Sequence, residues 1–323
     1  MATKHALATT LAGLILTAAP AAYAVAPPGN LANTVASWRG VHWRALDGRT
    51  DLVRTVTIAY RAHDGLRRTA LVVLPRWYGP RRDPVLPLVI SPHGSGVEPQ
   101  ENAHRWGNLP ALGRFAVVNP EGQGRRLELY SWGSPGEVAD LARMPAIVRH
   151  ALPWLRIAPH RIYAVGASMG GQETLLLDAT HPRLLAGAVA FDAPTNMAAR
   201  YALFPERRDG HRLQRLARLE FGGIPRVAGE AWADRSPIFY SRELAFSPAP
   251  LELWWSTRDR VVVDQASQSG LLFRAIERLN PRAPVVQVVG TWQHAAEMRP
   301  LRRLPFALAR IGLLQLSRVV RRR

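Results

Sequence analysis

The sequence predicts an α/β fold with a mostly parallel central sheet, helices on both faces, and an insertion before the penultimate strand. From about residue 50, short apolar runs rich in β-branched residues alternate with segments of helical spacing. Strands that are apolar along their whole length and alternate with helices are typical of a parallel sheet covered on both faces. Residues 193–248 interrupt this alternation once, before the apolar run at 251–256.

The expected elements follow in order along the chain. Residues 52–60 and 69–75 flank a polar turn that contains His63-Asp64-Gly65, so we expect a hairpin at the front edge of the sheet. Further strands are expected at residues 86–91, 115–120, 161–166, 186–191, 251–256 and 285–290. Helices are expected at about residues 101–113, 136–151, 169–180, 264–279 and 300–320.

The insertion at residues 193–248 is mostly polar and helix-like. Because it leaves the end of a strand, it is a candidate cap over a site, and peripheral packing is the alternative. The sequence has no internal repeat and no low-complexity linker. We therefore expect residues 25–323 to form a single domain.

Residues 1–24 predict a secretory signal peptide. Lys4 gives a basic start, an apolar run follows, and Ala22-Tyr23-Ala24 ends the segment with a small-x-small pattern. The apolar run is shorter than the ~20 residues that a membrane-spanning helix needs. We expect the mature chain to be secreted or in the cell envelope. Since the sequence has no cysteine, we expect neither disulfide bonds nor thiolate metal ligands.

The charge balance is strongly basic. The formal net charge is +18, and removal of the signal peptide takes away Lys4 and leaves +17, which is 18 minus 1. The remaining cations are arginines scattered in pairs such as Arg81-Arg82, and only the ending RVVRRR is concentrated. We interpret them as a solvated surface and expect no nucleic-acid partner. Weak association of the C-terminal arginine run with an anionic surface is a further expectation.

The segment RIYAVGASMGGQETLLL, residues 161–177, places one serine between an expected strand and an expected helix. It lacks the dinucleotide fingerprint G-x-G-x-x-G and the phosphate-binding pattern G-x-x-x-x-G-K-[ST]. The pattern Gly166-x-Ser168-x-Gly170 is a nucleophile elbow, in which glycines leave room for neighbouring strand and helix. A helix that starts at Met169 points its free N–H groups toward charge that develops at the site. A simple glycine-rich turn is the alternative.

A serine nucleophile needs a histidine base and an acid, which follow it in this architecture in the order serine, acid, histidine. His181, at the far end of the helix that Ser168 opens, and His211, in the insertion, lie far from the expected strand ends. His294 follows the last expected strand, so we predict that it is the base.

For the acid we prefer Asp259, which follows the strand at residues 251–256. All three groups then emerge at one edge of the sheet. Asp264 is expected to be a helix N-cap. Asp192, which ends the strand at 186–191, is the rival acid.

An oxyanion hole is expected from the small-residue loop His93-Gly94-Ser95-Gly96, which directly follows the strand at 86–91. Backbone N–H groups of Gly94 and Ser95, paired with the N–H of Met169, would stabilise a tetrahedral intermediate. A tight turn with no such role is the alternative.

With these motifs, about residues 50–300 resemble the α/β-hydrolase fold, and more narrowly the serine peptidase domain of the prolyl oligopeptidase family. The similar segments are RIYAVGASMGGQE, SPIFYSRELAFSPAPLELWW and DRVVVDQASQSGLLFRAIERL, together with His294. The resemblance implies the serine, acid and histidine roles for Ser168, Asp259 and His294. The segments HGSG and YSWGSPGEVADLARM are similar to secreted polyhydroxyalkanoate depolymerases and feruloyl esterases.

Three functions follow as hypotheses. The first is an exported serine hydrolase that needs no cofactor or metal and cleaves a small peptide, as the resemblance favours. A carboxylesterase acting on a small or polymeric ester is the alternative, and a non-catalytic basic protein that binds the cell envelope is a further alternative. Four tryptophans are candidates for the substrate pocket or for the core: Trp132, Trp254, Trp255 and Trp292.

Overall fold

The structure is a computed structural model that describes residues 52–122 and 131–316. All of these residues belong to the second of the two units into which the chain divides, Gly40–Arg323. The expected signal peptide at residues 1–24 and the arginine run at the C-terminus lie outside the described residues. The boundaries of the expected single domain stay a prediction. Over the described ranges, no helix combines the length and apolar character needed to cross a membrane.

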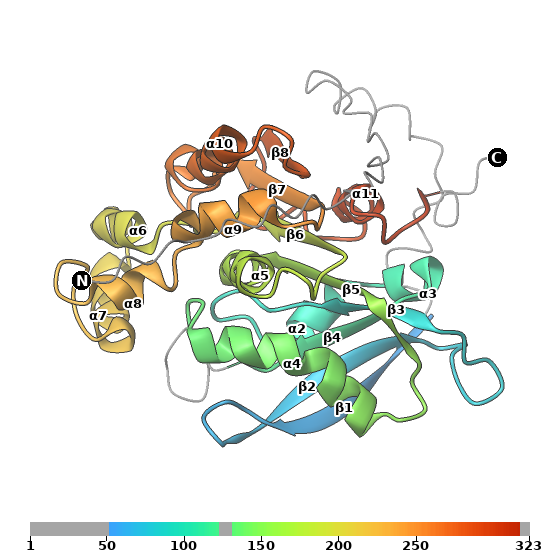
Figure 1. The fold of residues 1–323 in the computed structure, drawn as a ribbon. Coiled ribbons are helices and arrows are strands. Elements are labelled where there is room, and N and C mark those ends of the chain that lie inside the picture. The colour runs from blue at the N-terminus through green and yellow to red at the C-terminus, as the bar shows by residue number, and fades with distance from the viewer. Residues whose placement is uncertain (1–51, 123–130, 317–323) are drawn as a thin grey trace, which may run out of the picture. The chain divides into compact units, whose positions relative to one another are not determined.

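One sheet of eight strands runs through the described chain (Figure 1). Its strands, in sheet order, are β1 (Val53–Arg61), β2 (Arg67–Pro75), β4 (Ala116–Pro120), β3 (Leu86–Ile90), β5 (Ile157–Ala167), β6 (Gly187–Phe191), β7 (Leu251–Ser256) and β8 (Val285–Gly290). The strand β2 pairs antiparallel with both β1 and β4, and the other neighbours are parallel. The predicted fold class and the predicted hairpin are therefore confirmed.

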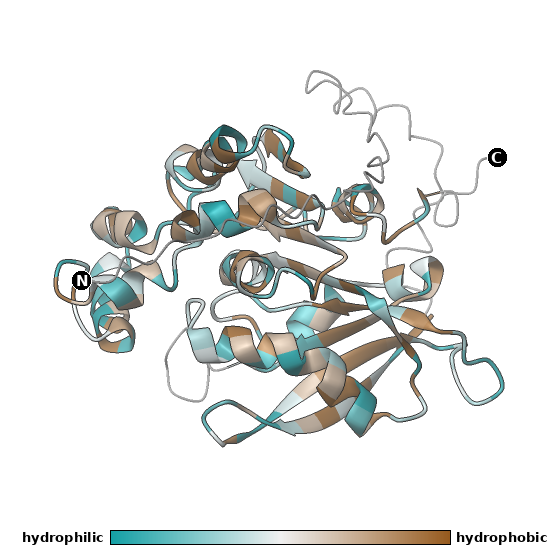
Figure 2. Ribbon diagram, viewed as in Figure 1, coloured by the Kyte–Doolittle hydropathy of each residue, from teal (hydrophilic) through white to brown (hydrophobic). Residues whose placement is uncertain are grey.

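Helices cover both faces of the sheet (Figure 1). One face carries α4 (Pro135–Ala151), α5 (Met169–Thr180), α9 (Ser241–Phe246) and α10 (Ser269–Leu279), whose apolar side chains share one buried cluster with the strands. The other face carries α2 (Pro99–His104), α3 (Leu109–Gly113) and α11 (Leu304–Arg310). On that face Arg310 Nε of α11 donates to Glu252 Oε1 of β7 over 2.8 Å. The central strands are hydrophobic along most of their length (Figure 2), as a doubly covered parallel sheet requires.

Three predicted helices differ from the observed ones. The segment 101–113 forms the two short helices α2 and α3, because Gly107 adopts a positive φ of 47° between them and Pro110 starts a new helix. The segment 264–279 begins with the 3₁₀ turn η5 (Gln265–Ser267) before α10. Within the predicted segment 300–320, residues 300–315 are helical only over α11, which ends before Gly312, a glycine with a φ of 77°.

The insertion at residues 193–248 contains α6 (Met197–Leu203), η3 (Phe204–Glu206), α7 (Gly210–Phe221), α8 (Gly229–Ala233) and η4 (Pro237–Tyr240), followed by α9. It has a buried apolar cluster of its own, which includes Met197, Phe204, Phe221 and Trp232. Met169, the residue after Ser168, belongs to the same cluster. The insertion therefore packs directly against the start of α5, where the nucleophile elbow lies.

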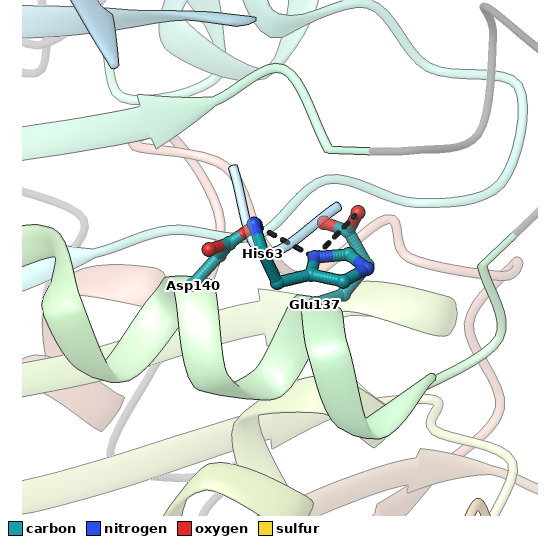
Figure 3. Close-up of side chains that lie close together, drawn as sticks. All are labelled: His63, Glu137 and Asp140. Atoms are coloured by element: carbon teal, nitrogen blue, oxygen red, sulfur yellow. Dashed lines mark hydrogen bonds and ion pairs between the residues drawn. The ribbon is translucent and has the colours of Figure 1, made fainter. Parts of the chain in front are cut away.

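A buried ion network ties the hairpin to α4. Arg68 of β2 is 1% exposed, and its Nη1 donates to Glu137 Oε1 over 2.6 Å. The same guanidinium also pairs with Asp64 and Asp140. His63 Nδ1 lies 2.9 Å from Asp140 Oδ2, and Figure 3 shows its ring beside the two carboxylates of α4. Burial raises the pKa of Glu137 to about 7, and Arg68 opposes this rise.

We expect Arg68→Met to lower the free energy of unfolding by about 3 kcal/mol or more, because it leaves buried carboxylates without their cation. Arg105→Met is the matched control, since Arg105 pairs with the exposed Glu101 one helical turn away. We expect Arg105→Met to lower the free energy of unfolding by less than about 1 kcal/mol. Urea unfolding of both variants measures the difference, and equal costs would contradict the role given to the network.

Candidate active site

The nucleophile elbow lies where β5 passes into α5. Ser168 adopts φ 58° and ψ −127°, a strained conformation for a residue with a side chain. A Cβ on Gly166 would lie 2.2 Å from the carbonyl oxygen of Gly170, and a Cβ on Gly170 would lie 2.2 Å from that of Pro92. Both positions must therefore be glycine, for the steric reason expected from the sequence.

Asp259 and His294 meet at the carboxyl edge of the sheet, beyond β7 and β8. His294 Nδ1 lies 2.7 Å from Asp259 Oδ2. The other carboxylate oxygen of Asp259 accepts the backbone N–H groups of Val261 and Val262, over 2.8 and 3.0 Å. Burial alone would raise the pKa of Asp259, but the hydrogen bond and charge of His294 and these N–H donors together lower it. The carboxylate is thus built to stay ionised beside the imidazole.

Asp192, the rival acid, has a different set of partners. Its carboxylate accepts the backbone N–H of Ser256 over 3.0 Å, that of Ala295 over 2.8 Å, and the indole N–H of Trp292 over 3.0 Å. Within the described ranges no hydrogen bond joins it to His294. Asp192 therefore fixes the two loops that carry Asp259 and His294.

Asp192 is fully buried. Burial and the negative charge of Asp259 raise its pKa, His294 and the N–H donors lower it, and the net pKa is about 6. Asp192 also has a positive φ of 47°, as does Ala295 with 57°. These strained residues lie at the bends that bring the loops together.

Ser168 joins this group through the backbone. Its N–H donates to the carbonyl of Phe191 over 2.8 Å, and Asp192 follows Phe191 directly. In the part of the chain that the structure describes, Ser168 and His294 form no hydrogen bond. Such bonds are often long in a free enzyme and tighten when substrate binds. The structure therefore brings the three residues predicted from the sequence to one edge of the sheet.

The loop predicted as an oxyanion hole lies against the elbow. A Cβ on Gly94 would lie 3.6 Å from the Cβ of Ser168. Among the described residues, the backbone N–H groups of Gly94, Ser95 and Met169 donate to no protein acceptor. His93 holds the loop, with Nε2 lying 2.6 Å from the carbonyl oxygen of Glu121 beyond β4. The three N–H groups are thus available to an oxygen bound beside Ser168.

The two other candidate histidines and Asp264 lie outside the candidate triad, as expected from the sequence. His181 caps the C-terminus of α5 and His211 is exposed on α7. Asp264 is the N-cap of η5 and accepts the N–H of Ser267.

The four tryptophans are mainly structural. Trp132, Trp254 and Trp255 are buried. The indole N–H of Trp292, which is partly exposed, donates to Asp192 and so anchors the histidine loop.

A small cavity of about 10 Å³ lies beneath the start of α5, lined by Pro92, His93, Ser131, Met169 and Glu173 among others. It has room for one water at most. Glu173 accepts the hydroxyl of Ser131 over 2.6 Å. Burial raises the pKa of Glu173 to about 8, and the Ser131 hydrogen bond opposes this rise. The sequence analysis did not identify this carboxyl group, because nothing in the segment MGGQETLLL shows that Glu173 faces inward.

Among the described residues, two groups of side chains have the donor spacing of a metal site: His63 with Glu137 and Asp140, and Asp192 with Asp259 and His294. In the first group Arg68 pairs with both carboxylates. In the second, the carboxylates accept N–H groups and contact the imidazole. These contacts within the protein account for the spacing of both groups.

Comparison with solved structures gives the fold a name. The chain superposes on the acylaminoacyl peptidase of Pyrococcus horikoshii with a TM-score of 0.60 and 15% identity, over 81% of this chain and 41% of that one. It superposes on an esterase of Pyrobaculum calidifontis with a TM-score of 0.60 and 17% identity, over 84% and 86%. It superposes on the fluorophosphonate-binding serine hydrolase F of Staphylococcus aureus with a TM-score of 0.60 and 13% identity, over 81% of this chain and 99% of that one.

These neighbours and the strand order confirm the predicted α/β-hydrolase fold. The chain spans about two fifths of the length of the acylaminoacyl peptidase. No protein-family model and no curated protein sequence matches the chain.

We expect Asp192→Asn to slow the reaction of Ser168 with a fluorophosphonate by about 10- to 100-fold, because an amide NH₂ would face N–H donors and displace the histidine loop. Asparagine tolerates the positive φ, so the backbone preference is kept. Asp264→Asn is the matched control, since Asp264 also has a positive φ but caps η5. Labelling rates of the two folded variants make the comparison. An unchanged rate in Asp192→Asn would contradict the positioning role.

Glu173 makes stability depend on pH. Its pKa rises on folding from 4.5 to about 8, so the folded state holds a proton that the unfolded state releases. The free energy of unfolding therefore falls as the pH rises between these values, by at most about 1.4 kcal/mol per pH unit from this group. We expect a smaller difference in stability between pH 5 and pH 8 in Glu173→Gln than in the wild type. Urea unfolding at both pH values tests this, with the exposed Glu277→Gln as control; an unaltered difference in Glu173→Gln refutes the assignment.

Proposed function

We propose that the chain is a serine hydrolase that cleaves acyl bonds through Ser168, His294 and Asp259. The observation that carries the proposal is the 2.7 Å contact between His294 and Asp259, beside a serine in a strained strand-to-helix turn. An imidazole held by an ionised carboxylate, at the sheet edge where a serine follows a strand, is the arrangement that activates a hydroxyl.

In the proposed mechanism His294 takes the proton of Ser168 as the oxygen attacks a carbonyl carbon. Asp259 orients the imidazole and stabilises the imidazolium that forms. Since Asp259 contacts Nδ1, the other ring nitrogen, Nε2, is the one that accepts and returns the proton. His294 then protonates the leaving group, and a water molecule, activated by the same imidazole, releases the acyl group from the serine.

The negative oxygen of the tetrahedral intermediate is proposed to bind between the N–H of Met169 and those of Gly94 and Ser95. The contact of Gly94 with the elbow and the free N–H groups support this assignment. Each such donor contributes roughly 3 kcal/mol to transition-state stabilisation in measured cases.

For the substrate we propose the amide bond of a short peptide, on the resemblance to the prolyl oligopeptidase family. A carboxylesterase is the second candidate, because the esterase and the hydrolase F chains are covered over 86% and 99% of their length. Peptide and ester differ in their leaving group but need the same triad. Export through the segment 1–24 and weak contact of the C-terminal arginine run with an anionic surface remain proposals from the sequence.

We expect the folded wild type to react with a fluorophosphonate probe, Ser168→Ala to lose the label, and His294→Ala to react far more slowly. His181→Ala, which changes a histidine at the end of α5, should label like the wild type. Gel fluorescence of the purified variants measures this. The proposal fails if the folded wild type takes up no label, or if Ser168→Ala keeps it.

Turnover then separates the two substrate classes. A higher kcat/KM on peptide 4-nitroanilides than on p-nitrophenyl esters, after correction for the reactivity of each leaving group, supports the peptidase. Ester turnover without amide turnover supports the carboxylesterase.

A further inference from the structure

A second buried arginine lies in the insertion, on α6. Arg200 is 7% exposed, and its Nε and Nη1 have no hydrogen-bond partner among the described residues. Over the described ranges no carboxylate lies within ion-pair distance of it. Arg68, the other arginine buried in these ranges, has three carboxylates around it. Both residues are buried, and within the described chain only Arg68 has a counterion.

An unpaired buried guanidinium destabilises the folded state, because no protein group replaces the hydrogen bonds to water that the charge has lost. The ring of Phe204, 5.5 Å from the guanidinium carbon, compensates only in part. Burial and the charge of Arg207 lower the pKa of Arg200 to about 10, so the side chain stays cationic at neutral pH. A cation kept in this state is pre-organised for an anion that the free protein does not supply.

The position of Arg200 places it near the triad. The helix α6 begins five residues after Asp192, and its first residue, Met197, packs in one cluster with Met169. Arg200 follows one turn later, close enough to Asp259 for the two charges to interact. The helix that carries Arg200 therefore starts beside the elbow.

The insertion also contacts the acid loop. Arg207 donates to the carbonyl of Val261 in that loop over 2.7 Å. A hollow of about 440 Å³ beside Asp259 is lined by Val263, by three arginines and by three acidic residues: Arg207, Arg208, Arg260, Glu206, Asp209 and Asp259. Because these opposite charges balance in number, the hollow does not by itself favour an anionic substrate.

We propose that Arg200 binds a carboxylate of the substrate, so that the hydrolase prefers acyl compounds with a carboxylate a few atoms from the scissile carbonyl. A planar guanidinium with free N–H donors matches a carboxylate in a two-point contact, which a lysine cannot reproduce. The proposal rests on the proposed function and names the substrate class of the same site. The carboxylate belongs either to the acyl group or to the leaving group.

Two pairs of substrates distinguish these sources. Mono-p-nitrophenyl succinate against p-nitrophenyl butanoate tests the acyl side, and 4-carboxyphenyl acetate against 4-carbamoylphenyl acetate tests the leaving side. In one pair we expect the wild type to favour the carboxylate by about tenfold or more in kcat/KM, as for a substrate group that pairs with a buried polar residue. Equal kcat/KM values within both pairs would overturn the proposal.

Variants of Arg200 test whether its side chain causes the preference for carboxylate substrates. Arg200→Met should abolish the preference within the pair of substrates, and Arg200→Lys should keep only part of it. Arg215→Met, the same change at an exposed site on α7, should behave as the wild type. Because Arg200 has no counterion to lose, Arg200→Met should melt no lower than the wild type. A clearly lower Tm, with the preference retained in the folded fraction, would assign Arg200 a structural role instead.

A binding measurement separates this proposal from the proposed function. We expect Ser168→Ala, which cannot react, to bind succinamate more tightly than butanamide in NMR titrations, and the double variant with Arg200→Met to lose the difference. Fluorophosphonate labelling without any carboxylate preference in binding or turnover would overturn the subsite and leave the hydrolase. Succinamate binding that depends on Arg200, in a chain whose Ser168 never labels, would support the subsite and refute the hydrolase.

Discussion

The buried carboxylate of Asp192 is the interaction on which the arrangement of the candidate site depends. Parallel strands bring their carboxyl ends to one edge, but the loops that follow them still need fixed directions. Asp192 accepts N–H groups of Ser256, Trp292 and Ala295 from the loops after β7 and β8. The residue before it accepts the N–H of Ser168. The carboxylate of Asp192 therefore links the acid loop to the histidine loop, and the preceding residue, Phe191, links both to the nucleophile. The surrounding donors offset part of the cost of burying the charge.

Local signals in the sequence were sufficient for the sheet and for the residues of the elbow. Continuous apolar runs predicted six of the eight strands of the described chain, and the hairpin pattern predicted the other two. The G-x-S-x-G spacing identified Ser168, because its glycines have a steric cause that the structure shows. Helix lengths were predicted less well, since Gly107 and Gly312 end helices through their positive φ within apparently periodic segments. The sequence favoured Asp259 over Asp192 as the partner of His294, and the structure decides between them through a contact between residues 35 positions apart.

The features that the sequence did not reveal share one physical cause: they are long-range and polar. Arg68 and Glu137 are 69 positions apart, and Ser131 and Glu173 are 42 apart. A charged residue in a sequence predicts a solvated surface, so Arg200 was counted among scattered arginines of a basic protein. Only the structure shows that it is enclosed without a counterion. The same basic composition thus contains a structural cation, Arg68, and a cation whose partner is proposed to be the substrate.

The proposed mechanism requires a covalent acyl intermediate on Ser168. The most direct test is the mass spectrum of the intact chain, quenched in acid after mixing with p-nitrophenyl acetate, followed by peptide mapping. We expect a transient gain of one acetyl group, located on the peptide that contains Ser168 and missing in Ser168→Ala. A folded chain that gains no acetyl group, or carries it on another residue, would refute the mechanism.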